Sequence, residues 1–219
     1  PEPGARPVLV DQANLAPGSV RMGEVTAEGG AYALENFRRA LLMANSGDVD
    51  AVCFTPFNKQ AMRHVYPAYD DEIRYASEVT GFTGPAREFN VLEGLWNARV
   101  TSHIPLAKVP SALSVERIVA ELKLTDRCLR DAGVANPRIA VAGLNPHAGE
   151  HGLFGDEDDR VIAPAVAASK SRGIDVAGPF PADTVFFRAV RGEFEVVIAC
   201  HHDQGVIPAK MLAFGKDVN

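Results

Sequence analysis

The chain has 219 residues, of which 47% are hydrophobic and 23% are charged, and its formal net charge is -6. This composition is typical of a soluble globular protein with one large or two small domains. No apolar run approaches the roughly 18 residues of a membrane span. An acidic chain without a basic block argues against nucleic acid and anionic membrane as partners. Three widely spaced cysteines, with no Cys-x-x-Cys pair, indicate a reducing cytoplasm.

Helical and strand patterns alternate in the first part of the chain. Leu34, Phe37 and Leu41 recur near the 3.6-residue period of a helix. Gly47 follows as a plausible helix stop. Short apolar runs that end before turn residues read instead as strands. We expect helices that open at Gly29, begin at Lys59 and span residues 70–80, and strands over residues 7–10 and 51–54.

The second part of the chain repeats this alternation. Ser114 can cap a long helix, because Val115, Ile118 and Leu122 recur on one side of it. Gly133 is placed to end that helix. We further expect strands over residues 89–92, 98–101, 138–142 and 194–200, and a helix over residues 161–171.

Alternating strands and helices predict an α/β fold with a mostly parallel sheet and helices on both of its faces. No Gly-x-Gly-x-x-Gly follows a predicted strand, and no P-loop sequence is present. An ordinary Rossmann dinucleotide site is therefore not indicated. The boundary between two lobes cannot be drawn from the sequence.

Three histidines, His103, His147 and His202, each come at or soon after the end of a predicted strand. Ligands of open α/β sheets bind outside the carboxyl ends of the strands. Neutral imidazole nitrogens are good ligands for zinc and neighbouring divalent metals. The three side chains could therefore form a metal site that leaves positions open for substrate oxygens. The alternative is that each histidine is an isolated polar residue.

Three further polar residues are placed to assist such a metal. Asp183 and Asp203 carry carboxylates that could orient an imidazole, although Asp183 could equally cap the helix that follows it. Lys210 lies eight residues after His202, on a helix that we expect to begin at Pro208. A desolvated lysine can act as an acid or base. The alternative for Lys210 is a solvated surface lysine.

Five segments of the chain carry recognisable motifs. They are Thr55-Pro56-Phe57-Asn58-Lys59, Thr101-Ser102-His103-Ile104-Pro105-Leu106, Gly143-Leu144-Asn145-Pro146-His147-Ala148-Gly149-Glu150, Gly178-Pro179-Phe180-Pro181-Ala182-Asp183-Thr184, and His202-Asp203-Gln204-Gly205 with Pro208, Lys210, Phe214-Gly215 and Asn219. These segments closely resemble the motifs of the 4-hydroxythreonine-4-phosphate dehydrogenase family, and they occur in the family's order over most of the chain. The resemblance is also compatible with a divergent paralogue of the family.

The resemblance implies a fold like that of the isocitrate and isopropylmalate dehydrogenases, and a homodimer with a shared active site. It implies NAD-dependent oxidation of a secondary alcohol of a small hydroxy acid, followed by loss of carbon dioxide, in pyridoxine biosynthesis. By motif position, the metal ligands are His103, His147 and His202, with one supplied by the partner subunit. Zinc is the favoured metal, with Mg, Mn or Co as alternatives. Lys210 and Asn219 match substrate-contacting positions and Asp183 an active-site carboxylate, whereas the choice between NAD and NADP stays open.

Two departures from the family pattern bear on function. Asp70 and Asp71 stand where the family has a histidine and a threonine that bind the substrate phosphate. Two carboxylates would repel a phosphate, so Asp70 and Asp71 predict an unphosphorylated or differently held substrate, unless they only cap the next helix. The family's usual N-terminal and C-terminal segments are also absent, so the chain is expected to be a partial family domain. NAD binding therefore depends on the resemblance alone.

Three other functions remain open at this stage. A dihydrodiol-carboxylate dehydrogenase of aromatic breakdown would fit the altered phosphate position. A zinc hydrolase would also use three histidines and a water, although no His-Glu-x-x-His pattern is present. A metal-binding remnant without catalytic activity is favoured only if the missing ends do not exist in the native protein.

Overall fold

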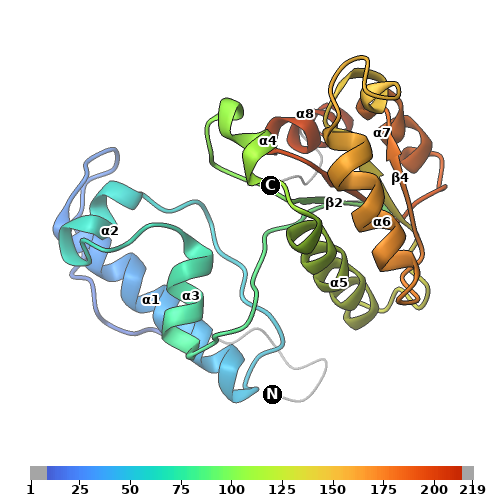
Figure 1. Cartoon of the computed structure of the whole chain (residues 1–219). Helices are drawn as coiled ribbons and strands as arrows, with labels where there is room; N and C mark the ends of the chain where they lie inside the picture. Colours follow the sequence, from blue (N-terminus) through green and yellow to red (C-terminus); the bar gives the residue numbers. More distant parts are fainter. Residues whose placement is uncertain (1–8, 214–219) are drawn as a thin grey trace. The chain divides into compact units, whose positions relative to one another are not determined.

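The chain forms two compact units, Pro1–Arg87 and Glu88–Asn219, and the computed structural model describes residues 9–213 (Figure 1). Each unit has its own hydrophobic core. The candidate site lies in the second unit.

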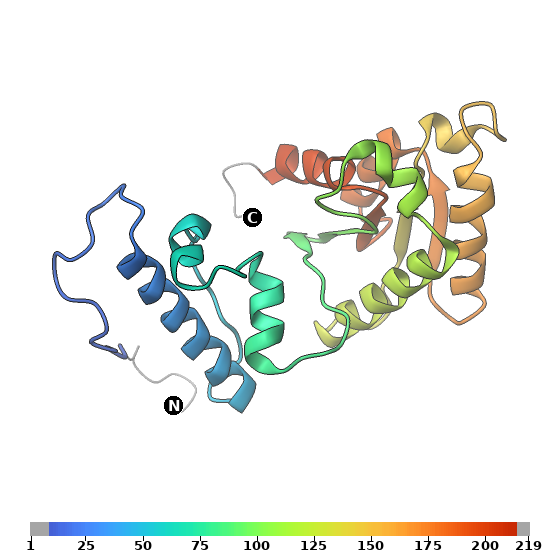
Figure 2. The same ribbon diagram turned by 60° about the vertical axis from the view of Figure 1, so that its left-hand side comes forward.

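The first unit is built from helices whose ends follow from capping residues. The side chains of Thr26, Asn58 and Asp71 each accept a hydrogen bond from a backbone N–H in the first turn of the helix they precede. Gly47 and Gly81 end two of these helices in the left-handed conformation. Figure 2 shows the three helices of this unit grouped together. The core that they share is rich in aromatic residues. The helices are α1 (Ala27–Ser46), α2 (Lys59–Val65) and α3 (Glu72–Thr80).

The two strands expected in the first unit are not observed. Residues 7 and 8 lie outside the described part, and Leu9 and Val10 are exposed and form no strand. Residues 51–54 are irregular, because an apolar run becomes a strand only where another strand pairs with it. Within this run, Phe54 packs on Phe37, with 4.9 Å between the ring centroids.

The second unit contains a five-stranded sheet that confirms the predicted fold class. The strands are β1 (Asn90–Leu92), β2 (Leu95–Arg99), β3 (Ile139–Ala142), β4 (Val176–Phe180) and β5 (Val196–Ala199). Their order in the sheet is β1-β2-β5-β3-β4, in which β1 and β2 are antiparallel and the remaining neighbours are parallel. The predicted strand pair is present, although its second strand runs over residues 95–99 and not over residues 98–101.

Helices cover both faces of this sheet (Figure 1). They are α4 (Val109–Ala112), α5 (Val115–Asp131), α6 (Ala163–Lys170), α7 (Ala182–Val190) and α8 (His202–Ala213), with shorter turns at Leu106–Lys108, Pro146–Gly149 and Asp158–Ile162. Ser114 caps α5 as expected. Buried side chains of α5 and α6, such as Ile118, Leu122 and Val166, form one core with the strands, and Val185 and Phe186 of α7 form the other.

Two features of the second unit correct the sequence-based interpretation. β4 was not expected, since Gly178 and Pro179 interrupt its apolar pattern. Pro208 lies inside α8 instead of at its start, because the helix already begins at His202 directly after β5. None of the helices in residues 9–213 is long and apolar enough to cross a membrane.

Candidate metal site at the carboxyl edge of the sheet

The carboxyl ends of four neighbouring strands meet at one edge of the sheet. β2, β5, β3 and β4 are adjacent and parallel in this order. The residues that follow them are, in the same order, His103, His202, His147 and Asp183. The topology therefore brings these four of the predicted site residues to the edge where α/β proteins bind ligands.

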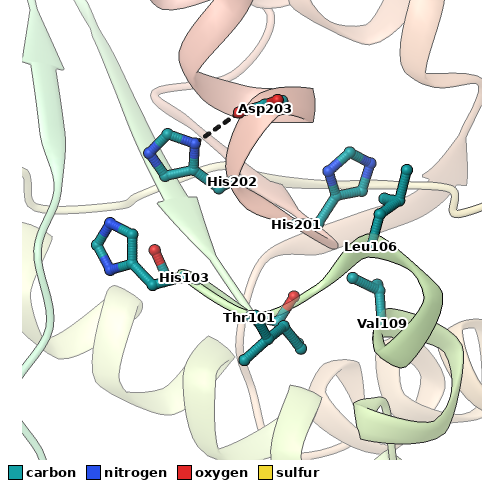
Figure 3. A pocket seen from close by; sticks show the side chains of 9 residues that line it. Thr101, His103, Leu106, Val109, His201, His202 and Asp203 are labelled. Atoms are coloured by element: carbon teal, nitrogen blue, oxygen red, sulfur yellow. Dashed lines mark hydrogen bonds and ion pairs between the residues drawn. The ribbon is translucent and has the colours of Figure 1, made fainter.

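His103 and His202 lie side by side at this edge (Figure 3). Their ring centroids are 5.3 Å apart, and both side chains line an open pocket of about 350 Å³. The backbone of His103 has a φ of 41°, a left-handed conformation that few residues other than glycine adopt. Such conformations concentrate at functional sites. The full pocket lining is Thr101, Ser102, His103, Ile104, Leu106, Val109, His201, His202 and Asp203.

Asp203 is placed to orient the imidazole of His202. The His202 Nδ1 lies 2.7 Å from the Asp203 Oδ1. This hydrogen bond lowers the pKa of the Asp203 carboxyl from its ordinary value. With the proton on Nδ1, the neutral imidazole leaves the Nε2 lone pair free for a metal, which is the usual carboxylate–histidine–metal arrangement.

His201 lines the same pocket but faces its apolar side, next to Leu106 (Figure 3). Partial burial lowers the pKa of His201 from its ordinary value. No sequence pattern singles out this histidine. Its place on the pocket wall follows from its position between β5 and α8.

His147 lies on an unusual left-handed turn and is not among the residues that line the pocket of His103 and His202. Residues 147–152 all have positive φ, between 41° and 88°. Each residue other than glycine costs about 1–2 kcal/mol in this conformation, so the surrounding structure must hold the turn. The His147 ring is exposed and packs on Phe154, with 5.9 Å between the ring centroids. Within residues 9–213, no group of three His, Cys, Asp or Glu side chains is close enough together to hold a metal.

A chain of hydrogen bonds joins the ends of three strands, and the sequence did not reveal it. The Thr101 hydroxyl donates to the Cys200 carbonyl at 2.7 Å. The Cys200 N–H donates to the Gln204 Oε1 at 2.7 Å, and the Gln204 Nε2 donates to the Gly143 carbonyl at 2.7 Å. Burial raises the pKa of the Cys200 thiol, whose Sγ lies 3.4 Å from the Ala142 carbonyl oxygen. These hydrogen bonds link the carboxyl ends of β2, β5 and β3 to one another.

Lys210 and Asp183 lie outside the pocket. Lys210 is exposed on α8, eight residues beyond His202, which corresponds to roughly 12 Å along the helix axis. Asp183 is exposed in the first turn of α7, whose N-terminal cap is Pro181. Asn219 lies outside the described residues.

Asp70 and Asp71 both have local partners in the first unit. Asp71 caps α3, because its Oδ1 accepts a hydrogen bond from the Arg74 backbone N–H at 2.7 Å. Asp70 forms an ion pair with the Arg74 guanidinium, with 3.6 Å between Oδ2 and Nη1. The capping alternative is thus confirmed for Asp71. A role for either carboxylate in substrate choice remains a prediction.

Replacing Asp203 with asparagine should lower the affinity for a divalent metal by about 10–100-fold, the usual effect of removing a carboxylate that orients a histidine ligand. Competition between the full-length protein and a chromogenic chelator measures this change. Asp131→Asn, at the exposed end of α5, is the control. Equal metal affinity in the Asp203 and Asp131 variants would show that Asp203 does not act through His202.

The chain is therefore an α/β protein in which histidines that follow the strand ends form a candidate metal site at the carboxyl edge of the sheet. The profile of the family described as pyridoxal phosphate biosynthetic protein PdxA matches residues 4–219. The chain belongs to this family.

Known relatives agree with this assignment. A Rhizobium meliloti protein provisionally named 4-hydroxythreonine-4-phosphate dehydrogenase 2 is 59% identical over 98% of this chain and 62% of its own length. The D-threonate 4-phosphate dehydrogenase of Salmonella typhimurium is 38% identical over 96% of this chain and 64% of its own length. The chain therefore spans less than two thirds of the length of these relatives.

Solved structures show the same fold. The crystal structure of 4-hydroxythreonine-4-phosphate dehydrogenase from Klebsiella pneumoniae aligns with a TM-score of 0.82 and 42% identity, over 91% of this chain and 60% of that one. A terephthalate 1,2-cis-dihydrodiol dehydrogenase from Burkholderia xenovorans aligns with a TM-score of 0.67 and 29% identity, over 92% of this chain and 64% of that one.

Proposed function

We propose that the protein is a metal-dependent, NAD-linked dehydrogenase that oxidises a secondary alcohol of a small hydroxy acid, after which the keto product loses carbon dioxide. The observation that carries this proposal is the pairing of His103 and His202 at the carboxyl edge of the sheet, with Asp203 orienting His202. The dehydrogenase names of the relatives support it. Pyridoxine biosynthesis is the corresponding pathway, and the three free cysteines support a cytoplasmic location.

His103, His147 and His202 would hold the metal in a homodimer, with one of the three ligands coming from the partner subunit. Within residues 9–213 of one chain the three histidines do not come together as a metal-binding group, which agrees with a site shared between two chains. An all-imidazole ligand set favours zinc, with Mn, Co or Mg as alternatives. Three protein ligands leave room for substrate oxygens.

Other residues of this chain would transfer the proton and bind the substrate. When bound, the metal supplies Lewis acidity at the substrate hydroxyl, and NAD accepts the hydride. Lys210 would take up or return the hydroxyl proton. Asp183 would serve as an active-site carboxylate, while Asn219 and Lys210 would bind substrate. Both Lys210 and Asp183 are exposed in one chain and could therefore approach a site completed by a second copy.

A dihydrodiol-carboxylate substrate is the second candidate. The likeness to a terephthalate dihydrodiol dehydrogenase and the carboxylates of Asp70 and Asp71 favour it. The zinc-hydrolase and non-catalytic alternatives have less support, because the relatives named above are dehydrogenases.

The proposal is tested by assaying NADH formation by the full-length gene product over a panel of hydroxy acids. The panel should include 4-hydroxythreonine 4-phosphate, D-threonate 4-phosphate, their unphosphorylated forms and a cyclic diol carboxylate. We expect metal-dependent NADH formation with at least one of them. Hydrolysis of ester or amide substrates without NADH formation would favour the hydrolase instead.

A further inference from the structure

A fully buried carboxylate lies directly beneath the turn that carries His147. Asp158 has no exposed surface, and both of its oxygens accept hydrogen bonds. Oδ1 accepts from the Leu144 backbone N–H at 2.8 Å, and Oδ2 accepts from the Asn145 backbone N–H and the Asn145 Nδ2, both at 3.0 Å. These donors belong to the segment that leads from β3 into the His147 turn.

Two glycines of this segment fit closely around the same carboxylate. A Cβ added at Gly143 would lie 2.8 Å from the Asp158 Oδ1, which is too short for a real contact. A Cβ added at Gly149 would lie 2.8 Å from the Gly155 carbonyl oxygen and 3.4 Å from the Asp158 Cβ. The glycines before and after His147 thus leave the space in which Asp158 can reach the backbone.

Within the described residues, Asp158 forms no ion pair with a lysine or arginine, so its charge is stabilised by the N–H donors of this segment. The turn itself contributes short-range hydrogen bonds, from the Glu150 N–H to the His147 carbonyl and from the Gly152 N–H to the Gly149 carbonyl. Those bonds lie within the turn. Asp158 adds contacts from outside it, because it accepts hydrogen bonds from Leu144 and Asn145, which lead into the turn, and packs against Gly149 within the turn.

We propose that Asp158 is a positioning residue for the metal site, because it holds the left-handed turn that presents His147. This inference rests on the proposed function, in which His147 is a metal ligand. An asparagine has the same shape but turns one acceptor into an N–H donor, which would face either the Leu144 N–H or the two donors of Asn145. The carboxylate, and not only its shape, is therefore required.

The test compares Asp158→Asn with Asp159→Asn in the full-length protein. Asp159 is the neighbouring residue and is exposed, so the control removes the same charge from the same segment. Cobalt(II) is the probe, because its visible spectrum reports both affinity and ligand geometry. Hydrogen exchange of residues 143–152 is measured alongside, with β5 as the internal reference.

We expect Asp158→Asn to remain folded, to bind cobalt about 10–100-fold more weakly with an altered spectrum, and to exchange faster over residues 143–152 than over β5. Asp159→Asn should match the unaltered protein. Unchanged cobalt affinity and exchange in Asp158→Asn would overturn the inference.

Two further outcomes separate this inference from the proposed function. If the unaltered protein binds no cobalt, the metal proposal fails, whereas hydrogen exchange still decides whether Asp158 holds the turn. If Asp158→Asn does not fold, Asn145→Ala decides, with Glu157→Ala as its control, because the Asn145 Nδ2 donates both to the Asp158 Oδ2 and to the Glu157 Oε2. A cobalt affinity that is weaker in folded Asn145→Ala than in Glu157→Ala supports the inference, and equal affinities overturn it.

Discussion

Replacing His147 with alanine in the full-length protein should remove most of the bound metal and nearly all dehydrogenase activity. Loss of a direct ligand should cost more than the roughly 10–100-fold effect of losing a residue that only orients a ligand. The His147 side chain is exposed and makes no hydrogen bond within residues 9–213, so the substitution should leave the fold intact. Elemental analysis of the purified variant and its rate of NADH formation measure the two effects.

The control for this experiment is His64→Ala, which removes an exposed histidine from α2 in the first unit. It should retain both metal and activity. Stoichiometric metal in His147→Ala would exclude this histidine as a ligand. A metal-free His147→Ala protein with full activity would exclude a catalytic role for the metal.

Changing Asp70→His together with Asp71→Thr should shift substrate preference toward phosphorylated hydroxy acids. A carboxylate only accepts hydrogen bonds at neutral pH, whereas a threonine hydroxyl and an imidazolium can donate them to a phosphate. The fold should tolerate the change, because threonine can replace Asp71 as the cap of α3 and the Asp70–Arg74 ion pair is exposed. The ratio of kcat/KM for phosphorylated and unphosphorylated substrates should rise by about 10-fold or more, equivalent to one charge-assisted hydrogen bond.

Asp48→His together with Asp50→Thr makes the same change of charge at two exposed aspartates of the same unit and should leave this ratio unaltered. If the unaltered protein already strongly prefers 4-hydroxythreonine 4-phosphate, the argument from Asp70 and Asp71 is wrong. Their hydrogen bond and ion pair at the start of α3 would then be their whole role.

The helices were the most predictable part of this fold. α1 and α5 combine apolar residues at a 3.6-residue spacing with a capping residue such as Ser114 and a glycine such as Gly47, and these are local signals. Strands depend on a partner far away in the sequence. Residues 51–54 look like a strand but have no ladder partner, whereas β4 pairs with β3 although Gly178 and Pro179 interrupt its pattern.

The part of the candidate site that depends only on which residues follow the strand ends was predictable from the sequence. His103 and His202 come directly after β2 and β5, which are neighbours in the sheet, and so their rings lie together. His147 follows β3 but lies on a left-handed turn. Apart from Gly149 and Gly152, no residue pattern in the sequence predicts the direction of this turn. For this reason the sequence predicted three converging histidines, while one chain brings two of them together.

Asp158 could have been found from spacing. Asp158, Ile162 and Ala165 are buried at intervals of four and three residues, as on the inner face of a helix. An acidic residue on an apolar face needs a partner, and the Asp156-Glu157-Asp158-Asp159 run conceals this by resembling a solvated charge cluster. The partners of Asp158 are backbone N–H groups, which only the folded chain reveals.

The central claim is that a metal held by these histidines is required for NAD-linked oxidation. The most direct test is NADH formation by the full-length protein, with its best substrate from the hydroxy-acid panel, after the metal has been removed with a chelator and again after a divalent metal has been restored. We predict that activity is lost with the metal and returns when one divalent ion per site is restored, most fully with zinc or cobalt. An unchanged rate in protein shown by elemental analysis to be metal-free would contradict the claim.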